Sequence, residues 1–446
     1  MPFFLPAKKR KFLTRFTPKR QQKQKSLEDT ELSSHSEDDN DHDGEIDLDS
    51  EAVAKKRLRQ TEEYIAEAKQ KELQREDDAE FISKSAGDTE QMADKTSDIS
   101  TQRRFVAHLY TQPPESSITK LKGHNPPVNC VAVSPDGKFA YSGARDGCII
   151  KWDIATCKRL STVKGCKKGS ELGRKTHTGS VICLVVSNNG ELLCSGGTDG
   201  NINVWNAGTM QHLKQFLGHK KTVTGLAVRK GHPQLFSCSM DRSVKVWDLE
   251  QMGYVETLFG HQDAVISVDC LQRERALTCG GRDRTVRLWK IVEESQLVFH
   301  AHSGCGSIDC VSLLNEDHFV SGSDDGSLCV WSLSRKKPVT VKAKAHQCEK
   351  GDTWITSIAC LPYTDLVASG SMDGSVRLWR VSEDYKSLSE VCTIPMVGFV
   401  NSMQFLPDGS GLVCAVSQEH RLGRWWRNKE AKNMVHLILL PRAEHS

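Results

Sequence analysis

The hydrophobic pattern between about residues 115 and 440 is that of short β-strands separated by turns. Val128–Val133 and Val223–Val228 are apolar runs of strand length, and Phe139–Ser142 follows the turn signal Pro135-Asp136-Gly137. Leu192–Ser195 follows a second signal of the same kind. Runs of this length, bounded by Gly, Pro and Asn, predict strands. The pattern gives about four strands per unit, too few for one unit to bury both faces of its sheet.

The strand pattern repeats, and polar and aromatic anchors mark seven units. Tryptophans recur at steps of 53, 42, 42, 42, 48 and 46 residues, each six residues after an acid. A His opens six of the units, and a Ser, Cys or Ala lies four residues before the acid. The sets are His124, Ser142, Asp146, Trp152; His177, Ser195, Asp199, Trp205; His219, Ser237, Asp241, Trp247; His261, Cys279, Asp283, Trp289; His302, Ser321, Asp325, Trp331; His346, Ser369, Asp373, Trp379; and Ala415, Glu419, Trp425. The sixth unit is longer because Gln347–Trp354 has the character of an inserted loop.

The four anchor types predict one local hydrogen-bond network in each unit. The carboxylate can accept from the His, the His can reach the Ser hydroxyl, and that hydroxyl can accept from the indole N–H. A Ser-His-Asp trio also invites comparison with a hydrolase triad. A catalytic triad occurs once, at one pocket, whereas this set repeats with Trp as a fourth member. The residues therefore indicate a structural tetrad and no enzyme.

The anchors resemble those of the WD40 repeat family. The resemblance rests on the tetrads, on Gly-His pairs such as Gly218-His219 and Gly260-His261, and on the Trp-Asp pairs Trp152-Asp153 and Trp247-Asp248. It implies an all-β fold, a seven-bladed β-propeller over residues 113–440, in which a ring of sheets closes the core. Five units should have complete tetrads, with Cys279 replacing Ser in the fourth and the weakest network in the seventh.

The sequence leaves the closure of the ring open. In WD40 proteins the N-terminal strand usually completes the last blade, and Ser117–Lys122 is placed to do so. Met434–Leu440 is a rival for the outer strand of the same blade.

Charge separates the N-terminal region from the repeats. Residues 1–25 have nine Lys and Arg and no acid, and residues 26–51 have twelve Asp and Glu and no Lys or Arg. Such blocks predict a disordered tail over residues 1–50. Residues 51–112 are expected to form a charged, partly helical extension, and residues 441–446 a short C-terminal tail. The basic run Lys8, Lys9, Arg10, Lys11 predicts nuclear localisation.

The cysteines and histidines do not predict a metal or cofactor site. All sixteen cysteines follow residue 129, and there is no secretory signal or apolar span, so free thiols are expected. A small residue recurs at one place in each unit and is expected to pack near the propeller axis. The seven are Cys130, Cys183, Gly225, Ser267, Cys310, Ser357 and Ser402. The one cluster, His300, His302, Cys305 and Cys310, contains a tetrad His, so no zinc site is expected there.

Longer segments are similar to the U3 small nucleolar RNA-interacting protein 2 family. They are Tyr254–Val265, Gly280–Asp283, Glu293–Phe299, Gly306–Cys310, Val397–Ser402 and Gln418–Arg427. The resemblance implies a nucleolar, non-catalytic subunit of the U3 ribonucleoprotein. Its implied partners are the box B/C region of U3 RNA, a kink-turn-binding protein, core box C/D proteins and small-subunit processome proteins. The implied role is support of the cleavages that release 18S rRNA, with no small-molecule substrate.

Exposed basic loops are the candidates for RNA contact, because Lys and Arg supply most of the sequence-independent affinity for phosphate. One cluster lies in the long insert after the first unit and another surrounds Trp425. The residues are Lys164, Lys167, Lys168, Arg174, Lys175, Arg421, Arg424, Arg427, Lys429 and Lys432. Each cluster is also compatible with an ordinary solvated surface, and Arg424 with a place in the channel or a pair with Glu419.

Two other classes of function compete with an RNA-binding subunit. A peptide-reading adaptor of a chromatin or ubiquitin-ligase complex would use the same fold, but the Trp-Asp-x-Arg pattern of ligase receptors is missing after both Trp152 and Trp247. A propeller enzyme would need one unique acid or metal cluster at the channel mouth, and the sequence offers none.

Overall fold

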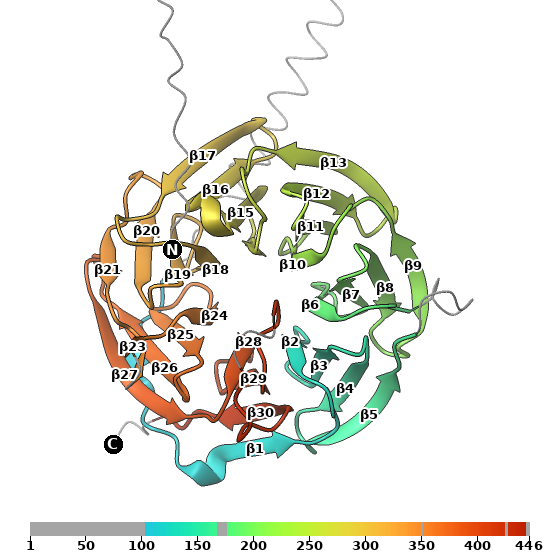
Figure 1. Ribbon diagram of the computed structural model, residues 1–446, viewed down its shortest axis with the longest axis horizontal. Coiled ribbons are helices and arrows are strands. Elements are labelled where there is room, and N and C mark those ends of the chain that lie inside the picture. Colours follow the sequence, from blue (N-terminus) through green and yellow to red (C-terminus); the bar gives the residue numbers. More distant parts are fainter. Residues whose placement is uncertain (1–102, 167–175, 349–350, 424–426, 443–446) are drawn as a thin grey trace, which may run out of the picture. The chain divides into compact units, whose positions relative to one another are not determined.

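The structure is a computed structural model that describes residues 103–166, 176–348, 351–423 and 427–442. These residues form a ring of seven four-stranded antiparallel sheets around a central channel (Figure 1). The expected seven-bladed propeller is therefore confirmed. Among the described residues, no helix has the length and apolar character needed to cross a membrane. The predicted tail over residues 1–50, the basic run Lys8–Lys11 and most of the predicted extension lie outside the described residues.

Each of the first six blades uses four consecutive strands, with the first strand at the channel and the fourth at the rim (Figure 1). The blades are β2 (Val128–Val133), β3 (Phe139–Ala144), β4 (Ile149–Asp153) and β5 (Lys158–Val163); β6 (Val181–Val186), β7 (Leu192–Gly197), β8 (Ile202–Asn206) and β9 (His212–Phe216); β10 (Val223–Val228), β11 (Gln234–Ser239), β12 (Ser243–Asp248) and β13 (Gly253–Phe259); β14 (Ser267–Asp269), β15 (Arg275–Gly280), β16 (Thr285–Lys290) and β17 (Ser295–His300); β18 (Ile308–Leu313), β19 (His318–Ser323), β20 (Leu328–Ser332) and β21 (Thr340–Lys342); and β24 (Ile355–Cys360), β25 (Leu366–Ser371), β26 (Ser375–Val381) and β27 (Leu388–Pro395).

The hydrophobic core lies in the seams between blades. Every residue of β2 and of β10 is buried, because a neighbouring blade covers each face of an inner strand. The outer strand β5 is largely exposed and polar. Trp152 is almost fully buried, in a cluster that joins blade one to strands of blade seven. Apolar residues thus gather on the inner strands, while the outer strands are more exposed and combine polar residues with exposed apolar ones such as Leu213 and Phe259.

Blade seven combines the two ends of the propeller and settles the question of closure. Its strands run in the order β1 (Ile118–Leu121), β30 (Met434–Leu439), β29 (Gly411–Ser417) and β28 (Phe399–Phe405). The two candidates are therefore not rivals: β30 is the third strand, and β1 pairs with it as the outer strand. The unpaired edge that β30 would otherwise expose is covered by the chain's own beginning.

The assignment of Trp425 to the third strand of blade seven is wrong. That strand begins only at Met434, and Trp425 itself lies outside the described residues. Ile438 pairs with Leu412 in the register where Trp152 pairs with Ala140. The connection between β29 and β30 is long, so the repeat spacing reaches Trp425 nine residues before β30 begins.

Residues 103–112 form a strap beneath blades six and seven, where a helical extension was expected. The only helical element in this stretch is the 3-10 turn η1 (Ala107–Leu109), and Arg104 forms a parallel bridge with Thr364. The Asp365 carboxylate accepts from the N–H groups of Val106 and Ala107 at 2.8 and 2.9 Å. Contacts with the propeller thus replace the local hydrogen bonds of a helix in residues 103–112.

The predicted insertion of the sixth unit is a small hairpin. Its strands are β22 (Gln347–Cys348) and β23 (Gly351–Asp352), between blades five and six. Trp354 follows this hairpin and packs against His420 of the β29–β30 loop, with ring centroids 4.7 Å apart and the rings tilted by 35°. The insertion therefore supports the irregular loop of blade seven.

Candidate functional site

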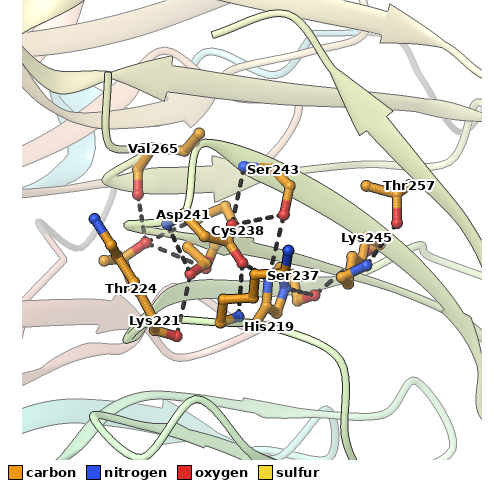
Figure 2. Close-up of polar contacts among 12 residues, drawn as sticks. His219, Lys221, Thr224, Ser237, Cys238, Asp241, Ser243, Lys245, Thr257 and Val265 are labelled. Atoms are coloured by element: carbon orange, nitrogen blue, oxygen red, sulfur yellow. Dashed lines mark hydrogen bonds and ion pairs between the residues drawn. The ribbon is translucent and has the colours of Figure 1, made fainter. Parts of the chain in front are cut away.

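The tetrad of blade three contains the predicted network in full, and Figure 2 shows its His219, Ser237 and Asp241. Trp247 Nε1 donates to Ser237 Oγ at 2.8 Å, and Ser237 Oγ lies 2.8 Å from His219 Nε2. His219 Nδ1 donates to the Asp241 carboxylate at 3.0 Å. Because the carboxylate can only accept, the chain of donors runs from Trp through Ser and His to Asp.

The network holds its carboxylate in the charged form. Burial alone would raise the pKa of Asp241, but the hydrogen bonds from His219 and Ser243 outweigh it and hold the pKa well below its usual range. The second carboxylate oxygen accepts from the Ser243 N–H and hydroxyl, which fixes the turn between β11 and β12 (Figure 2). All polar atoms of this buried chain have partners, so it has the character of a scaffold.

Blades two and six contain the same complete Ser tetrads, and blade four contains a tetrad with a different residue at its centre. His261 Nε2 and Trp289 Nε1 both lie 2.8 Å from Thr278 Oγ1, and His261 Nδ1 lies 2.7 Å from the Asp283 carboxylate. The assignment of Cys279 to this place is wrong by one residue. The 3-10 turn η4 (Gly281–Asp283) adds a residue before the acid, so counting back four from Asp283 missed the threonine.

Two tetrads expected to be complete are not. In blade one, His124 Nε2 and Trp152 Nε1 contact Ser142 at 2.7 Å, but no His124–Asp146 hydrogen bond occurs among the described residues. The next residue, Asn125, precedes two prolines that restrict its backbone, and its N–H does not reach the carboxylate as Lys220 N–H does in blade three.

In blade five the imidazole lies differently. His302 uses Nε2 to contact Asp325 at 3.0 Å, and its Nδ1 lies 3.7 Å from Cys329 Sγ. The Trp331 indole still donates to Ser321. The His-to-Asp spacing of this unit is one residue longer than in blades one to four. That extra residue changes the direction from which the ring approaches the turn.

The described residues of blade seven do not form a tetrad. Ser402 pairs with Ala415 in the register where Cys130 pairs with Gly143, so Cys414, and not Ala415, takes the place of the tetrad serine. Glu419 pairs instead with Arg145 of blade one at 2.5 Å. The expected weakness of this network is confirmed. The Glu419 carboxylate instead forms an ion pair that joins blade seven to blade one.

The seven small residues predicted near the axis do line the central channel. They belong to a cavity of about 690 Å³ that the first strands of all seven blades enclose. Burial raises the pKa of Cys130 to about 12, so this thiol stays protonated and unreactive near neutral pH. The packing interpretation of this position is confirmed.

In blades one, three, six and seven, a polar side chain at the start of the inner strand joins the blade to the next one, and sequence reasoning missed these links. Asn129 Nδ2 donates to Val181 O at 2.7 Å, and Thr224 Oγ1 donates to Val265 O (Figure 2). At the ring closure, Asn401 Nδ2 and Ser417 Oγ both donate to Val128 O. An Asn or Thr directly before the small residue, as in these four blades, is the signal that could have revealed them.

The two ends of the ring differ in character. The turns with the tetrad Asp and the loops with the tetrad His share one end, which we call the tetrad face. The strap and the turns after the first and third strands share the other, which we call the strap face. The loop after β5 and the β29–β30 loop both lie on the tetrad face, as the strand registers require.

The predicted RNA-contact residues that the structure describes fall into two groups. Four of them lie on the rim of the propeller, and one lies at the central channel. Lys164, Arg427, Lys429 and Lys432 are exposed on the tetrad face, and we call these four residues the basic rim. Asn433 Nδ2 donates to Asn125 O, so the β29–β30 loop lies against blade one. The other predicted contacts, Lys167, Lys168, Arg174, Lys175 and Arg424, lie outside the described residues.

Arg421 differs from the basic rim because it lines the central channel. Its charge lowers the pKa of thiols on three different blades, those of Cys130, Cys183 and Cys310, although burial raises each of them more strongly. In Figure 1 the β29–β30 loop reaches the channel beside β28. Arg421 could be identified from the sequence as a basic candidate residue. Its position at the channel could not, because the sequence does not show that the β29–β30 loop turns inward.

Comparisons with known proteins agree with this architecture. The family model "WD domain, G-beta repeat" matches residues 115–153, 169–206, 210–248, 253–290, 293–332 and 339–380. The chain is 48% identical to U3 small nucleolar RNA-interacting protein 2 of Homo sapiens, over 88% of this chain and 83% of that protein. It is 26% identical to ribosomal RNA-processing protein 9 of Saccharomyces cerevisiae, over 72% and 59%. The solved "Structure of U3-55K" is 47% identical, with a TM-score of 0.70 over 74% of this chain and 100% of that one.

Proposed function

Because the chain belongs to the U3 small nucleolar RNA-interacting protein 2 family of WD40-repeat proteins, we propose that it is a non-catalytic subunit of the U3 small nucleolar ribonucleoprotein. The observation that carries this proposal is the 48% identity over 88% of the chain to the human protein of that name. The likeness to a yeast ribosomal RNA-processing protein supports a role in the same process. The proposed role is to support the cleavages that release 18S rRNA.

The proposed ligand is U3 RNA at its box B/C region, bound together with a kink-turn-binding protein, core box C/D proteins and small-subunit processome proteins. The basic rim supports this proposal physically. Its four cations are exposed, come from two adjacent loops and lie on one face. Such a group can contact successive phosphates, and the affinity should then fall as salt rises.

The remaining sequence-based expectations extend the proposal. Lys8, Lys9, Arg10 and Lys11 would direct import into the nucleus, and U3 binding would retain the protein in the nucleolus. The insert residues Lys167, Lys168, Arg174 and Lys175, together with Arg424, would extend the basic rim. The scaffold itself supplies binding surfaces and no reaction, so the tetrads serve only to hold the blades.

A charge-reversal experiment tests the RNA surface. Arg427, Lys429 and Lys432 are changed together to Glu in the full chain, and binding to a labelled U3 box B/C fragment with the kink-turn-binding protein is titrated at several salt concentrations. We expect weaker binding and a salt slope reduced by about 0.7–0.9 for each lost phosphate contact. The matched control reverses Arg335, Lys336 and Lys337, which are exposed in the β20–β21 turn of the strap face. Equal losses in both variants, or none, would reject the basic rim as the RNA surface.

A further inference from the structure

The turn that contains the tetrad acid places its next residue in the left-handed region of the backbone. That residue is a glycine with φ between 74° and 85° in blades one, two, five and six, namely Gly147, Gly200, Gly326 and Gly374. In blades three and four it is an arginine: Arg242 has a φ of 70° and Arg284 a φ of 55°. Residues other than Gly are strained in this region because their Cβ crowds the backbone. Two adjacent blades therefore present an arginine on the tetrad face at a cost in backbone strain.

No contact within the described residues offsets this strain. Both arginine side chains are exposed, and neither forms an ion pair or a side-chain hydrogen bond there. The neighbouring acids Asp241 and Asp283 are bound to their tetrad histidines, and Asp263 in the next loop forms no ion pair among those residues. The tetrads do not need an arginine, because blades two and six have complete tetrads with Gly at this place. Strain at an exposed position without a structural purpose indicates a role in binding.

Strand β13, which follows the turn of Arg242, is an outer strand with an exposed apolar surface. Tyr254, Val255 and Phe259 are 54%, 53% and 74% exposed, and Leu217 at the end of blade two is 67% exposed. The outer edge of β13 pairs with no other strand among the described residues. Proteins usually cover such an edge or protect it with charge. An uncovered apolar edge strand therefore indicates a surface for a partner.

Phe259 lies between the two arginines. It pairs with Ser243, the residue after Arg242, at the tetrad-face end of β13. The loop that follows Phe259 reaches the turn of Arg284, because the tetrad His of that loop binds the acid directly before Arg284. The apolar surface of β13 thus ends between two exposed guanidinium groups.

Leu217 and Tyr254 extend this surface toward blade two. Lys245 Nζ donates to Thr257 Oγ1 at 2.6 Å (Figure 2). The Tyr254 hydroxyl lies 2.7 Å from the same Thr257 oxygen. The residue after Leu217 lies against the Lys245 side chain. The exposed apolar side chains of the two blades are therefore joined into one surface along β13.

The chemistry of this surface favours an acidic protein segment over RNA. RNA bases stack on aromatic faces, and the aliphatic Leu217 and Val255 offer none. Exposed apolar surface bordered by charge is typical of protein interfaces. Arginine binds a carboxylate through two parallel hydrogen bonds, and Lys220 adds an exposed cation beside Arg242. Since β13 is extended and its edge is free, an extended segment can pair with its backbone.

We propose that β13 and the arginine turns at its tetrad-face end bind an extended acidic segment of a partner protein. Apolar side chains of that segment cover Tyr254 and Phe259, and its carboxylates pair with Arg242 and Arg284. The surface lies at the outer edge of the ring, and none of these residues lines the central channel (Figure 1). The proposal goes beyond U3 binding and does not depend on it, because the basic rim uses other residues.

The test selects random dodecapeptides displayed on phage against the immobilised full chain. We expect the enriched peptides to combine Asp or Glu with apolar residues. A synthetic copy should bind Arg242→Gly and Phe259→Ser at least about tenfold more weakly than wild type. Lys344→Gly is the matched control, because Lys344 is also an exposed cation with a positive φ, of 55°. This change removes one charge and a similar strain elsewhere, and should leave peptide binding unchanged.

Two further measurements separate binding from a structural role and from RNA. Arg242→Gly should melt at the wild-type temperature or above, because Gly relieves the strain, whereas a structural role of Arg242 would lower the melting temperature. Binding of the U3 box B/C fragment should be the same for Arg242→Gly, Phe259→Ser and wild type. Loss of RNA binding in these variants would assign the surface to RNA and overturn the proposal. Recovery of no acidic peptide, or of peptides that bind both variants as tightly as wild type, would overturn it as well.

Discussion

At the scale of single residues, a hydroxyl group at the centre of each tetrad joins a buried indole to a buried imidazole. In blade four this hydroxyl belongs to Thr278, which is fully buried between His261 and Trp289. Removing it leaves two buried polar groups without partners, and each such group costs about 1–3 kcal/mol. The hydroxyl therefore matters more than the shape of the side chain that presents it.

This difference gives the first prediction. Thr278→Val keeps the shape of the side chain but removes its hydroxyl, and should lower the free energy of unfolding by about 2–3 kcal/mol. Thr278→Ser keeps the hydroxyl and should cost only about 1 kcal/mol for the lost methyl group. Urea unfolding followed by tryptophan fluorescence measures both. If Val were tolerated better than Ser, the tetrad of blade four would not depend on Thr278.

Histidines outside the complete tetrads make stability depend on pH. His436 of β30 is buried, and its burial together with Lys120 lowers its pKa to about 4. The unfolded chain binds the proton near pH 6.5, so the unfolded state takes up more protons between pH 6.5 and 4. The stability that His436 supplies is complete above pH 6.5 and decreases as the pH falls toward 4.

The second prediction follows from this decrease in stability as the pH falls. Between pH 7 and pH 5 the wild-type protein should lose about 2 kcal/mol through His436 alone. His436→Leu should show a correspondingly smaller loss over the same interval. Unfolding free energies at the two pH values give the comparison. An identical pH dependence in both proteins would show that His436 does not titrate as its burial requires.

At the scale of elements, regular blades could be predicted from the sequence and irregular connections could not. The strands of blades two, three and six follow their anchors because each turn between Ser and Asp has the same length. The one-residue extension at Gly281–Asp283 means that Thr278, and not Cys279, is the central residue of the blade-four tetrad. The long β29–β30 loop means that the third strand of blade seven begins at Met434, after Trp425 in the sequence. Loop lengths change register without changing residue type, so pattern matching alone does not detect them.

The strap is the element whose role the sequence least revealed. Arg103 donates to the carbonyl groups of Val381 and Ser382 and lies over the Tyr385 ring, 4.2 Å from its centroid. Asp365, which is fully buried, receives two backbone N–H groups from the strap. These contacts join ordinary polar residues that are far apart in the sequence, so no local sequence pattern predicts them.

The third prediction concerns this strap. A chain that begins at residue 103 should unfold at the same temperature as the full chain, because every described contact of the strap is retained. A chain that begins at residue 113 leaves Asp365 buried without its two N–H donors, and should lose about 3 kcal/mol or more. Thermal unfolding of the two truncated chains makes the comparison. Equal melting temperatures would show that residues 103–112 do not contribute to the propeller.

At the scale of the whole molecule, the ring separates structural from functional positions. The tetrads, the seam hydrogen bonds and the strap fix the seven blades, and they use residues that are buried or bonded to their own chain. The basic rim is held by the same scaffold, and its four cations are exposed on one face of the ring. This division suits the proposed role in binding, because rigid elements hold the structure and exposed loops present charge.

We propose that this propeller binds U3 RNA as a subunit of the U3 ribonucleoprotein. Crosslinking of the full-length protein in cells, followed by immunoprecipitation and RNA sequencing, tests it most directly. We expect U3 RNA to be the most enriched RNA, with crosslinks at its box B/C region, and reversal of Arg427, Lys429 and Lys432 to reduce this enrichment. Recovery of U3 RNA only at the level of other nucleolar RNAs would contradict the proposed function.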